Sequence, residues 1–260
     1  MRSSPILTAQ WRNLVMLNYV VDPELLRPFV PCGTEIDFWN DQTFVSVVGF
    51  QFQQARWFGW RLPWQGSIDE INLRFYVRRK SGREWRRGVV FLKEIAPCLA
   101  ISLVARWVYN EQYITLATRS VIESPVGTID GPGSVSYLWK WDGRWNEVAA
   151  TIRGRPCLPE SSSEAEYIAE HYWAYTAQRD GSTLEHHVEH PPWLVWPAET
   201  CRFSGDIAKL YGLDFARVLN QTPTSAFVAD GSAVSVHRAG RLTAKSVRNS
   251  NLRNSPCPSL

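Results

Sequence analysis

The sequence predicts a mainly β fold, a β-rich form of the α+β class with a few short helices. Three observations support this: apolar and polar residues alternate over short stretches, turn-forming residues separate these stretches, and helical patterns are short. At 260 residues, with 45% hydrophobic residues, the chain can bury a large core. It shows no internal repeat and no linker, so we expect a single domain over residues 1–244.

Alternation locates the strands. Leu73, Phe75 and Val77 alternate with polar residues, which predicts a strand with one apolar and one mixed face. The turn at 80–83 predicts that the next strand returns beside it. Strands are expected at 44–50, 70–78, 88–92, 114–122, 133–141, 147–153 and 183–190.

Capping residues locate the helices. Asp22 followed by Pro23 predicts a single turn that stops before Pro31, and Ser163 followed by acidic residues predicts a second helix. The helices are expected at 22–27, 163–168, 206–210 and 214–219. The remaining residues, 245–260, are rich in Ser, Asn, Arg and Pro and are expected to form a disordered tail.

Charge and cysteine content narrow the class of protein. A net charge of +3 does not indicate a polyanionic partner, and the five cysteines are scattered without a C-x-x-C pair. The N-terminus lacks the apolar run of a signal peptide, and the longest apolar stretch, 97–109, is interrupted by Arg106. We expect a soluble cytoplasmic protein that binds neither nucleic acid nor membranes.

Residues 167–196 contain four of the five histidines and three of the thirteen tryptophans. Aromatic rings provide rigid walls and histidine provides an exchangeable proton, which is typical of a ligand pocket. His171 lies among aromatic residues and is a candidate catalytic acid or base; an aromatic core layer is the alternative. His190 and Trp193 flank two prolines that fix the end of a strand, so both are candidate ligand-binding residues at a pocket rim.

His187 stands between two glutamates on the same expected strand, a pattern that could bind a metal ion. No two histidines have metal-ligand spacing on a helix, however. We therefore interpret 183–190 as an edge strand with a solvated polar face, and we expect neither a metal nor a cofactor.

Glu70, Asn72 and Arg74 alternate at the start of a strand and are expected to project from one face. The row could be a buried Glu–Arg pair, or part of a pocket that anchors a carboxylate, and the two are compatible. Glu70 is a candidate catalytic residue, and Asn72 and Arg74 are candidate ligand-binding residues.

Basic residues cluster at the turn of the same hairpin, with Trp85 among them. Such a cluster can bind nucleic acid or an anionic surface, but at hairpin tips it more often serves solubility and edge protection. The cluster consists of Arg78, Arg79, Lys80, Arg83, Arg86 and Arg87.

Several separated motifs resemble the bacterial YqjF-like family of unknown function, in the acetoacetate-decarboxylase-like superfamily. They are Asp22-Pro23-x-x-Leu26-Arg27-Pro28-x-Val30-Pro31, Glu70-Ile71-Asn72-Leu73-Arg74-x-Tyr76-Val77, Glu170-His171-Tyr172-Trp173 and His190-Pro191-x-Trp193. The resemblance implies an antiparallel β-barrel or cone around a small-molecule pocket, and such folds can assemble into homo-oligomers. It also implies that the pocket arginine is Arg12 and the pocket glutamate Glu70.

The resemblance also shows what this chain lacks. Acetoacetate decarboxylases form a Schiff base through a lysine, and the corresponding region, 105–113, contains none. Lys93 lies nearby in the sequence but has no second lysine beside it. We therefore expect a protein that binds a small organic acid or aromatic metabolite of unknown identity. The alternatives are a lysine-free lyase, isomerase or hydrolase with Glu70 as acid or base and Arg12 as carboxylate anchor, and anionic-surface binding through the hairpin tip.

Overall fold

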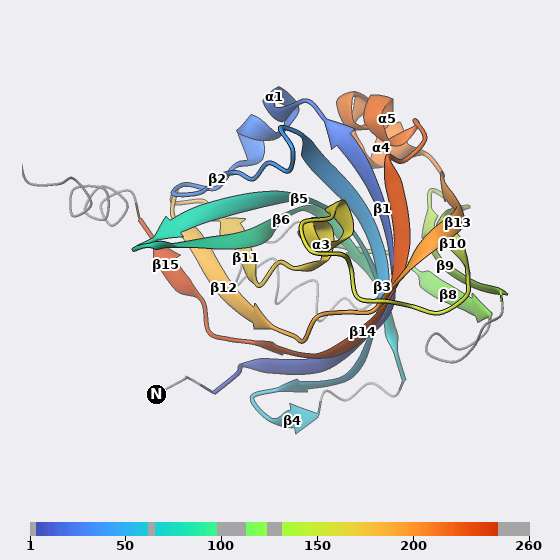
Figure 1. Ribbon diagram of the computed structural model, residues 1–260, viewed down its shortest axis with the longest axis horizontal. Coiled ribbons are helices and arrows are strands. Elements are labelled where there is room, and N and C mark those ends of the chain that lie inside the picture. Colours follow the sequence, from blue (N-terminus) through green and yellow to red (C-terminus); the bar gives the residue numbers. More distant parts are fainter. Residues whose placement is uncertain (1–3, 62–65, 98–112, 124–131, 244–260) are drawn as a thin grey trace, which may run out of the picture.

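The computed structural model describes residues 4–61, 66–97, 113–123 and 132–243 (Figure 1). Its helices are α1 (Pro23–Leu26), the 3-10 turn η1 (Arg27–Phe29), α3 (Glu164–Ala169), α4 (Ile207–Tyr211) and α5 (Leu213–Leu219). Its strands are β1 (Leu7–Val21), β2 (Glu35–Ile36), β3 (Thr43–Trp57), β4 (Trp60–Arg61), β5 (Ile68–Ser81), β6 (Glu84–Ala96), β7 (Tyr113–Thr115), β8 (Thr118–Glu123), β9 (Pro132–Trp141), β10 (Arg144–Arg153), β11 (Trp173–Ala177), β12 (Thr183–Glu189), β13 (Val195–Ser204), β14 (Ser225–Val236) and β15 (Gly240–Leu242).

The strands form one large curled sheet. Their order is β15-β12-β11-β6-β5-β3-β1-β14-β13-β10-β9-β8, and an additional pairing of β12 with β14 brings the path back on itself. That pairing comprises two residue pairs, Val188 with Val236 and Glu189 with Ser235. Most neighbours are antiparallel, but β6 pairs in parallel with both β7 and β11, so the sheet is mixed.

The curl gives the sheet two faces with separate cores. On the inner face, residues of β1, β3 and β5 pack against α3, which Figure 1 shows inside the curl. On the outer face, β9, β10, α4 and α5 cover a larger apolar cluster. Val15 and Leu17 belong to the outer cluster, whereas Leu14 and Met16 belong to the inner one. Strand β1 is thus buried on both faces over 14–17, where its sequence runs apolar without alternation.

The predicted β-rich class is confirmed, and most predicted elements are present. Asp22, Ser163 and Asp206 each accept a backbone hydrogen bond at the start of α1, α3 and α4, as the capping pattern predicts. The expected strand at 114–122 is instead two strands, β7 and β8. The expected tail, 245–260, lies outside the described residues.

The sequence pattern missed β1, β13 and β14, and it misplaced β12. Instead of lying at an edge, β12 is paired with β11 on one side and with β15 and β14 on the other. Glu185, expected on its solvated face, is buried and binds Arg79 and Arg86. At Glu185 the polar face of β12 is therefore part of an internal charge network, whereas His187 and Glu189 on the same face are about one third exposed.

Candidate functional site

Strand β5 carries a row of polar residues across the inner face of the sheet. Glu70, Asn72, Arg74 and Tyr76 occupy alternate positions, and all four are buried. The first three pair with Phe50, Val48 and Ser46 of β3, and the last three pair with residues of β6 on the other side. Because Val48, Phe50 and Tyr76 belong to the inner apolar cluster, the whole row faces inward.

Glu70 lies at one end of this row in a largely desolvated environment. Its Oε2 accepts a hydrogen bond from the Tyr113 hydroxyl at 3.0 Å, and its Oε1 accepts a longer one from Asn72 at 3.5 Å. Burial raises the pKa of Glu70 to about 7, and these two hydrogen bonds offset part of the rise. Near neutral pH this carboxyl can therefore both donate and accept a proton.

A second buried carboxyl group lies on the same face. Glu94 of β6 is directly opposite Asn72 and is 3% exposed. Directly paired residues of antiparallel strands project from the same face, so Glu94 is a diagonal neighbour of Glu70. Sequence reasoning missed both Glu94 and Tyr113, although Glu94 follows the expected strand 88–92 by only two residues.

Arg74 lies four residues after Glu70 in this row. At about 3.3 Å per residue, the two residues are about 13 Å apart along the strand. Its Nη2 donates to the Ile168 carbonyl at 3.3 Å and approaches the Met16 sulfur at 3.8 Å. Within the described part of the chain, Arg74 forms no ion pair, and its Nε has no hydrogen-bond partner. The Oδ1 of the neighbouring Asn72 also lacks a partner there.

His171 closes the Arg74 end of the row. Its ring lies 4.6 Å from the Tyr76 ring, tilted by 37°, and meets Tyr167 edge-on at 5.5 Å. Burial lowers the pKa of His171 well below its usual range, and the positive charges of Arg87 and Arg74 lower it further. The imidazole is therefore neutral at physiological pH and able to accept a hydrogen bond, but it is a weak base.

His190 and Trp193 lie together at the exit of β12. Their rings stack at 4.2 Å with an interplanar angle of 17°, and Tyr172 lies 4.8 Å from His190 on another side. Trp193 is held by a hydrogen bond from its Nε1 to the Ser232 hydroxyl. Burial lowers the pKa of His190, and Arg74 contributes in the same direction. These contacts place the pair on the inner face, toward the Arg74 end.

Arg12 is the one predicted site residue that the structure does not bring to this row. Strand β1 has one extra residue between Arg12 and Val15 relative to β3, and Asn13 at this β-bulge has a φ of 55°. A bulge reverses the alternation, so Trp11 packs on Phe50 and Phe52 of the inner face and Arg12 points outward.

The surroundings of Arg12 confirm the outward direction. Its guanidinium donates to the Gln10 side chain at 2.9 Å and to the Gly231 carbonyl at 3.3 Å. Gly231 has a φ of 79°, and a Cβ there would lie 2.1 Å from the Trp11 carbonyl oxygen, so only glycine fits opposite this bulge. Arg12 belongs to an outer polar network, and Arg74 is the buried arginine near Asn72.

Lys93 is also excluded from the inner row. It is paired with Leu73, which faces the outer core, and its ammonium group donates to the Leu210 carbonyl of α4. Burial lowers the pKa of Lys93, but the side chain lies on the opposite face from Glu70. The structure thus offers no route by which Lys93 replaces the lysine missing from 105–113, a range of which the structure describes only Tyr113.

The basic cluster of the β5–β6 hairpin is largely neutralised by carboxylates. Glu185 accepts hydrogen bonds from Arg79 at 2.9 Å and from Arg86 at 2.7 Å. On the other side, Arg78 pairs with Glu35 and Arg87 with Asp37, at 2.7 and 2.6 Å. Four of the six basic residues therefore pair with carboxylates of the protein, which weakens the idea of an anion-binding tip.

Comparisons with known proteins agree with this architecture. The chain is 27% identical over 202 residues to the uncharacterized protein YqjF of Bacillus subtilis, an alignment that covers 75% of this chain and 76% of YqjF. Among solved structures, acetoacetate decarboxylase of Legionella pneumophila superposes with a TM-score of 0.63 at 13% identity, covering 92% of this chain and 88% of that one. The enduracididine biosynthesis enzyme MppR, solved in complex with pyruvate, gives a TM-score of 0.63 at 15% identity, covering 95% and 93%.

These structural likenesses show that the fold is of the acetoacetate-decarboxylase type. In the described part of the chain, none of the helices has the length and apolar character needed to cross a membrane. The model of the DUF2071 family, described as an uncharacterized conserved protein, matches residues 8–233. Because this match spans most of the sequence, the chain belongs to the DUF2071 family.

Proposed function

We propose that this protein binds a small organic acid on the inner face of its sheet, with Arg74 as the carboxylate anchor. The observation that carries the proposal is the buried guanidinium of Arg74, which has no ion-pair partner among the described residues. An isolated buried charge costs several kcal/mol, and a bound carboxylate would offset that cost. Arginine binds carboxylates through two parallel hydrogen bonds, and the unpartnered Nε is available to donate one of them.

The remaining groups suit the rest of such a ligand. Asn72 and the neutral carboxyl of Glu70 can donate hydrogen bonds to oxygen atoms of the ligand, and Tyr76, His190 and Trp193 provide aromatic walls. His171 is neutral, so it does not compete with Arg74 for the negative charge of the ligand. The pyruvate bound by the similarly folded MppR supports a small keto acid as the first ligand class to test.

Calorimetric titration with pyruvate and a panel of keto, hydroxy and aromatic acids tests this proposal. We expect Arg74→Met to weaken the affinity at least about tenfold, because a hydrogen bond to a charged group contributes about 1.5–3 kcal/mol. Arg12→Met is the matched control, since Arg12 lies on the outer face, and it should leave the affinity unchanged. Loss of binding in the Arg12 variant alone, or no binding by the wild type to any acid, contradicts the proposal.

A second function, proton-transfer catalysis without lysine, is favoured by one observation. A carboxyl group whose pKa is near 7 exchanges protons efficiently at neutral pH, and burial raises the pKa of Glu70 to about 7. Glu70 would then move a proton at the carbon next to the ligand's carbonyl. Deuterium incorporation into a bound keto acid, followed by proton NMR, should occur with the wild type and cease in Glu70→Gln. Incorporation that persists in this variant assigns the proton transfer elsewhere.

A further inference from the structure

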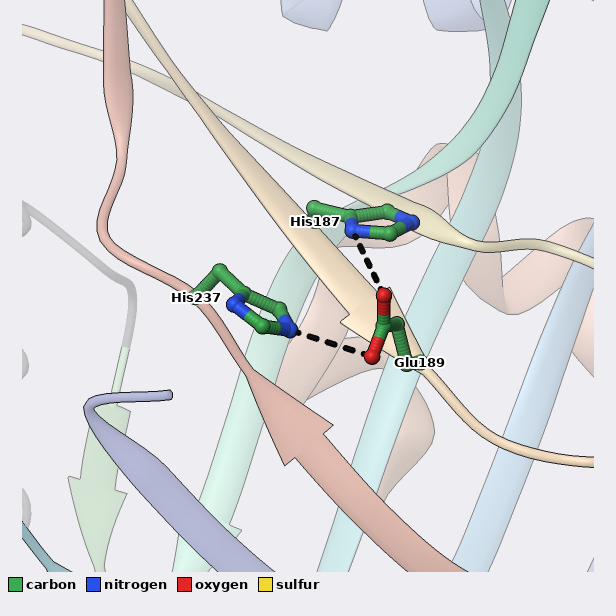
Figure 2. Close-up of side chains that lie close together, drawn as sticks. All are labelled: His187, Glu189 and His237. Atoms are coloured by element: carbon green, nitrogen blue, oxygen red, sulfur yellow. Dashed lines mark ion pairs between the residues drawn. The ribbon is translucent and has the colours of Figure 1, made fainter. Parts of the chain in front are cut away.

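Three residues on the outer face of the sheet form a compact group of nitrogen and oxygen donors. His187 and Glu189 are two residues apart on β12, and His237 follows the end of β14. The backbone amide of His237 donates to the His187 carbonyl at 2.9 Å, so these two histidines are cross-strand neighbours. Figure 2 shows the three side chains converging from the two strands.

The distances between the donor atoms suit a shared ion. One carboxylate oxygen of Glu189 lies 3.6 Å from His187 Nδ1, and the other lies 3.2 Å from His237 Nε2. One donor atom from each of the three side chains lies within 4.8 Å of the others. Ligands at about 2.1 Å from a tetrahedral metal are about 3.4 Å apart, so small side-chain adjustments complete the geometry.

The surroundings fix the His187 ring. It lies 4.6 Å from the Trp173 ring and 5.4 Å from the His237 ring, and the Arg86 guanidinium lies over Trp173 at 4.2 Å. This stack reduces the number of orientations that His187 can adopt, which lowers the entropic cost of binding an ion. The side chains of His187 and Glu189 are 35% and 37% exposed, so an ion can reach the group from solvent.

We propose that His187, Glu189 and His237 bind a divalent transition-metal ion, with water completing its coordination. Two imidazoles and one carboxylate favour Zn²⁺, Co²⁺ or Ni²⁺ over Mg²⁺ and Ca²⁺, which prefer oxygen ligands only. Trp173, which is paired with His187, packs against the outer core, so the site lies on the opposite face from Glu70. The proposal is therefore independent of the organic-acid function.

Titration of the untagged full chain with ZnCl₂ by calorimetry, and with CoCl₂ by visible spectroscopy, tests the site. The exposed thiols of Cys32 and Cys157 are first replaced by serine, because thiolates also bind these ions. We expect saturable binding with one ion per chain. His187→Asn, His237→Asn and Glu189→Gln should each weaken it at least about tenfold.

Glu199→Gln is the matched control, since Glu199 is a glutamate on β13 that pairs with Arg153 away from the group. Its affinity for Zn²⁺ should equal that of the parent. Circular dichroism of each metal-free variant establishes that it is folded. Two outcomes overturn the proposal. One is the absence of saturable binding, and the other is an affinity for Zn²⁺ that equals the parent's in all three ligand variants.

Discussion

At the tip of the β5–β6 hairpin, Arg79 and Arg86 reach the same buried carboxylate of Glu185, whereas Arg74, five residues before Arg79 on the same strand, has no such partner within the described residues. The tip satisfies its charges with groups of the protein. In the inner row, Asn72 Oδ1 and Arg74 Nε have no hydrogen-bond partner among the residues that the structure describes. Since buried polar groups are nearly always satisfied in native proteins, the contrast directs the search for a ligand to the inner row.

The largest effect should follow from breaking the network at the tip. Glu185→Ala leaves Arg79 and Arg86 without their shared carboxylate and removes a hydrogen-bond acceptor of the Tyr175 hydroxyl. Breaking a buried ion pair on one side typically costs 3–5 kcal/mol, so we expect the free energy of unfolding to fall by about 4 kcal/mol. Urea denaturation measures the change. A loss below about 1 kcal/mol would mean that these arginines remain available for an external anion.

The second largest effect concerns Glu70 of the inner row, whose contribution to the free energy of unfolding should depend on pH. Glu70 has a folded-state pKa raised from 4.5 to about 7, so between these values the native state binds more protons than the unfolded state. Stability contributed by Glu70 is present below about pH 4.5 and is lost as the pH rises through 7. At 1.36 kcal/mol per pH unit, this amounts to about 3 kcal/mol.

Glu70→Gln should remove this dependence, because the amide does not titrate. Urea denaturation at pH 5 and pH 8 should show a drop in stability for the wild type that is larger than the drop for the variant. Equal drops in the two proteins would show that Glu70 is already ionised in the folded state. In that case its role as a proton donor would have to be abandoned.

The smallest effect is expected at the exposed rim of the tip. Arg78 pairs with Glu35, and both side chains are more than one third exposed. Solvent-exposed pairs contribute about 0–1 kcal/mol, so Arg78→Gln should change the free energy of unfolding by less than about 1 kcal/mol. A larger loss of unfolding free energy in the same urea assay would show that the Arg78–Glu35 pair stabilises the fold, as the ion pairs of Glu185 do.

The local patterns of the sequence determined a good part of this protein. Alternation places Glu70, Asn72 and Arg74 on one face of β5, and capping residues place the starts of α1, α3 and α4. The same alternation failed for β1, because this strand is covered on both faces and carries a bulge at Asn13. A pattern of period two cannot reveal an inserted residue. The family resemblance placed Arg12 in the site, and the bulge leaves its side chain on the outer face.

What only the tertiary structure decided is which distant residues meet. Glu185 meets Arg79 and Arg86, and His237 meets His187 and Glu189, across separations of 48 residues or more in sequence. These contacts depend on strand order and register, which are set by non-local pairing and packing rather than by neighbours along the chain. The sequence alone determined the β-rich class, the polar row and the absence of lysine from 105–113. The curl of the sheet decided that the row faces inward while the histidine group faces outward.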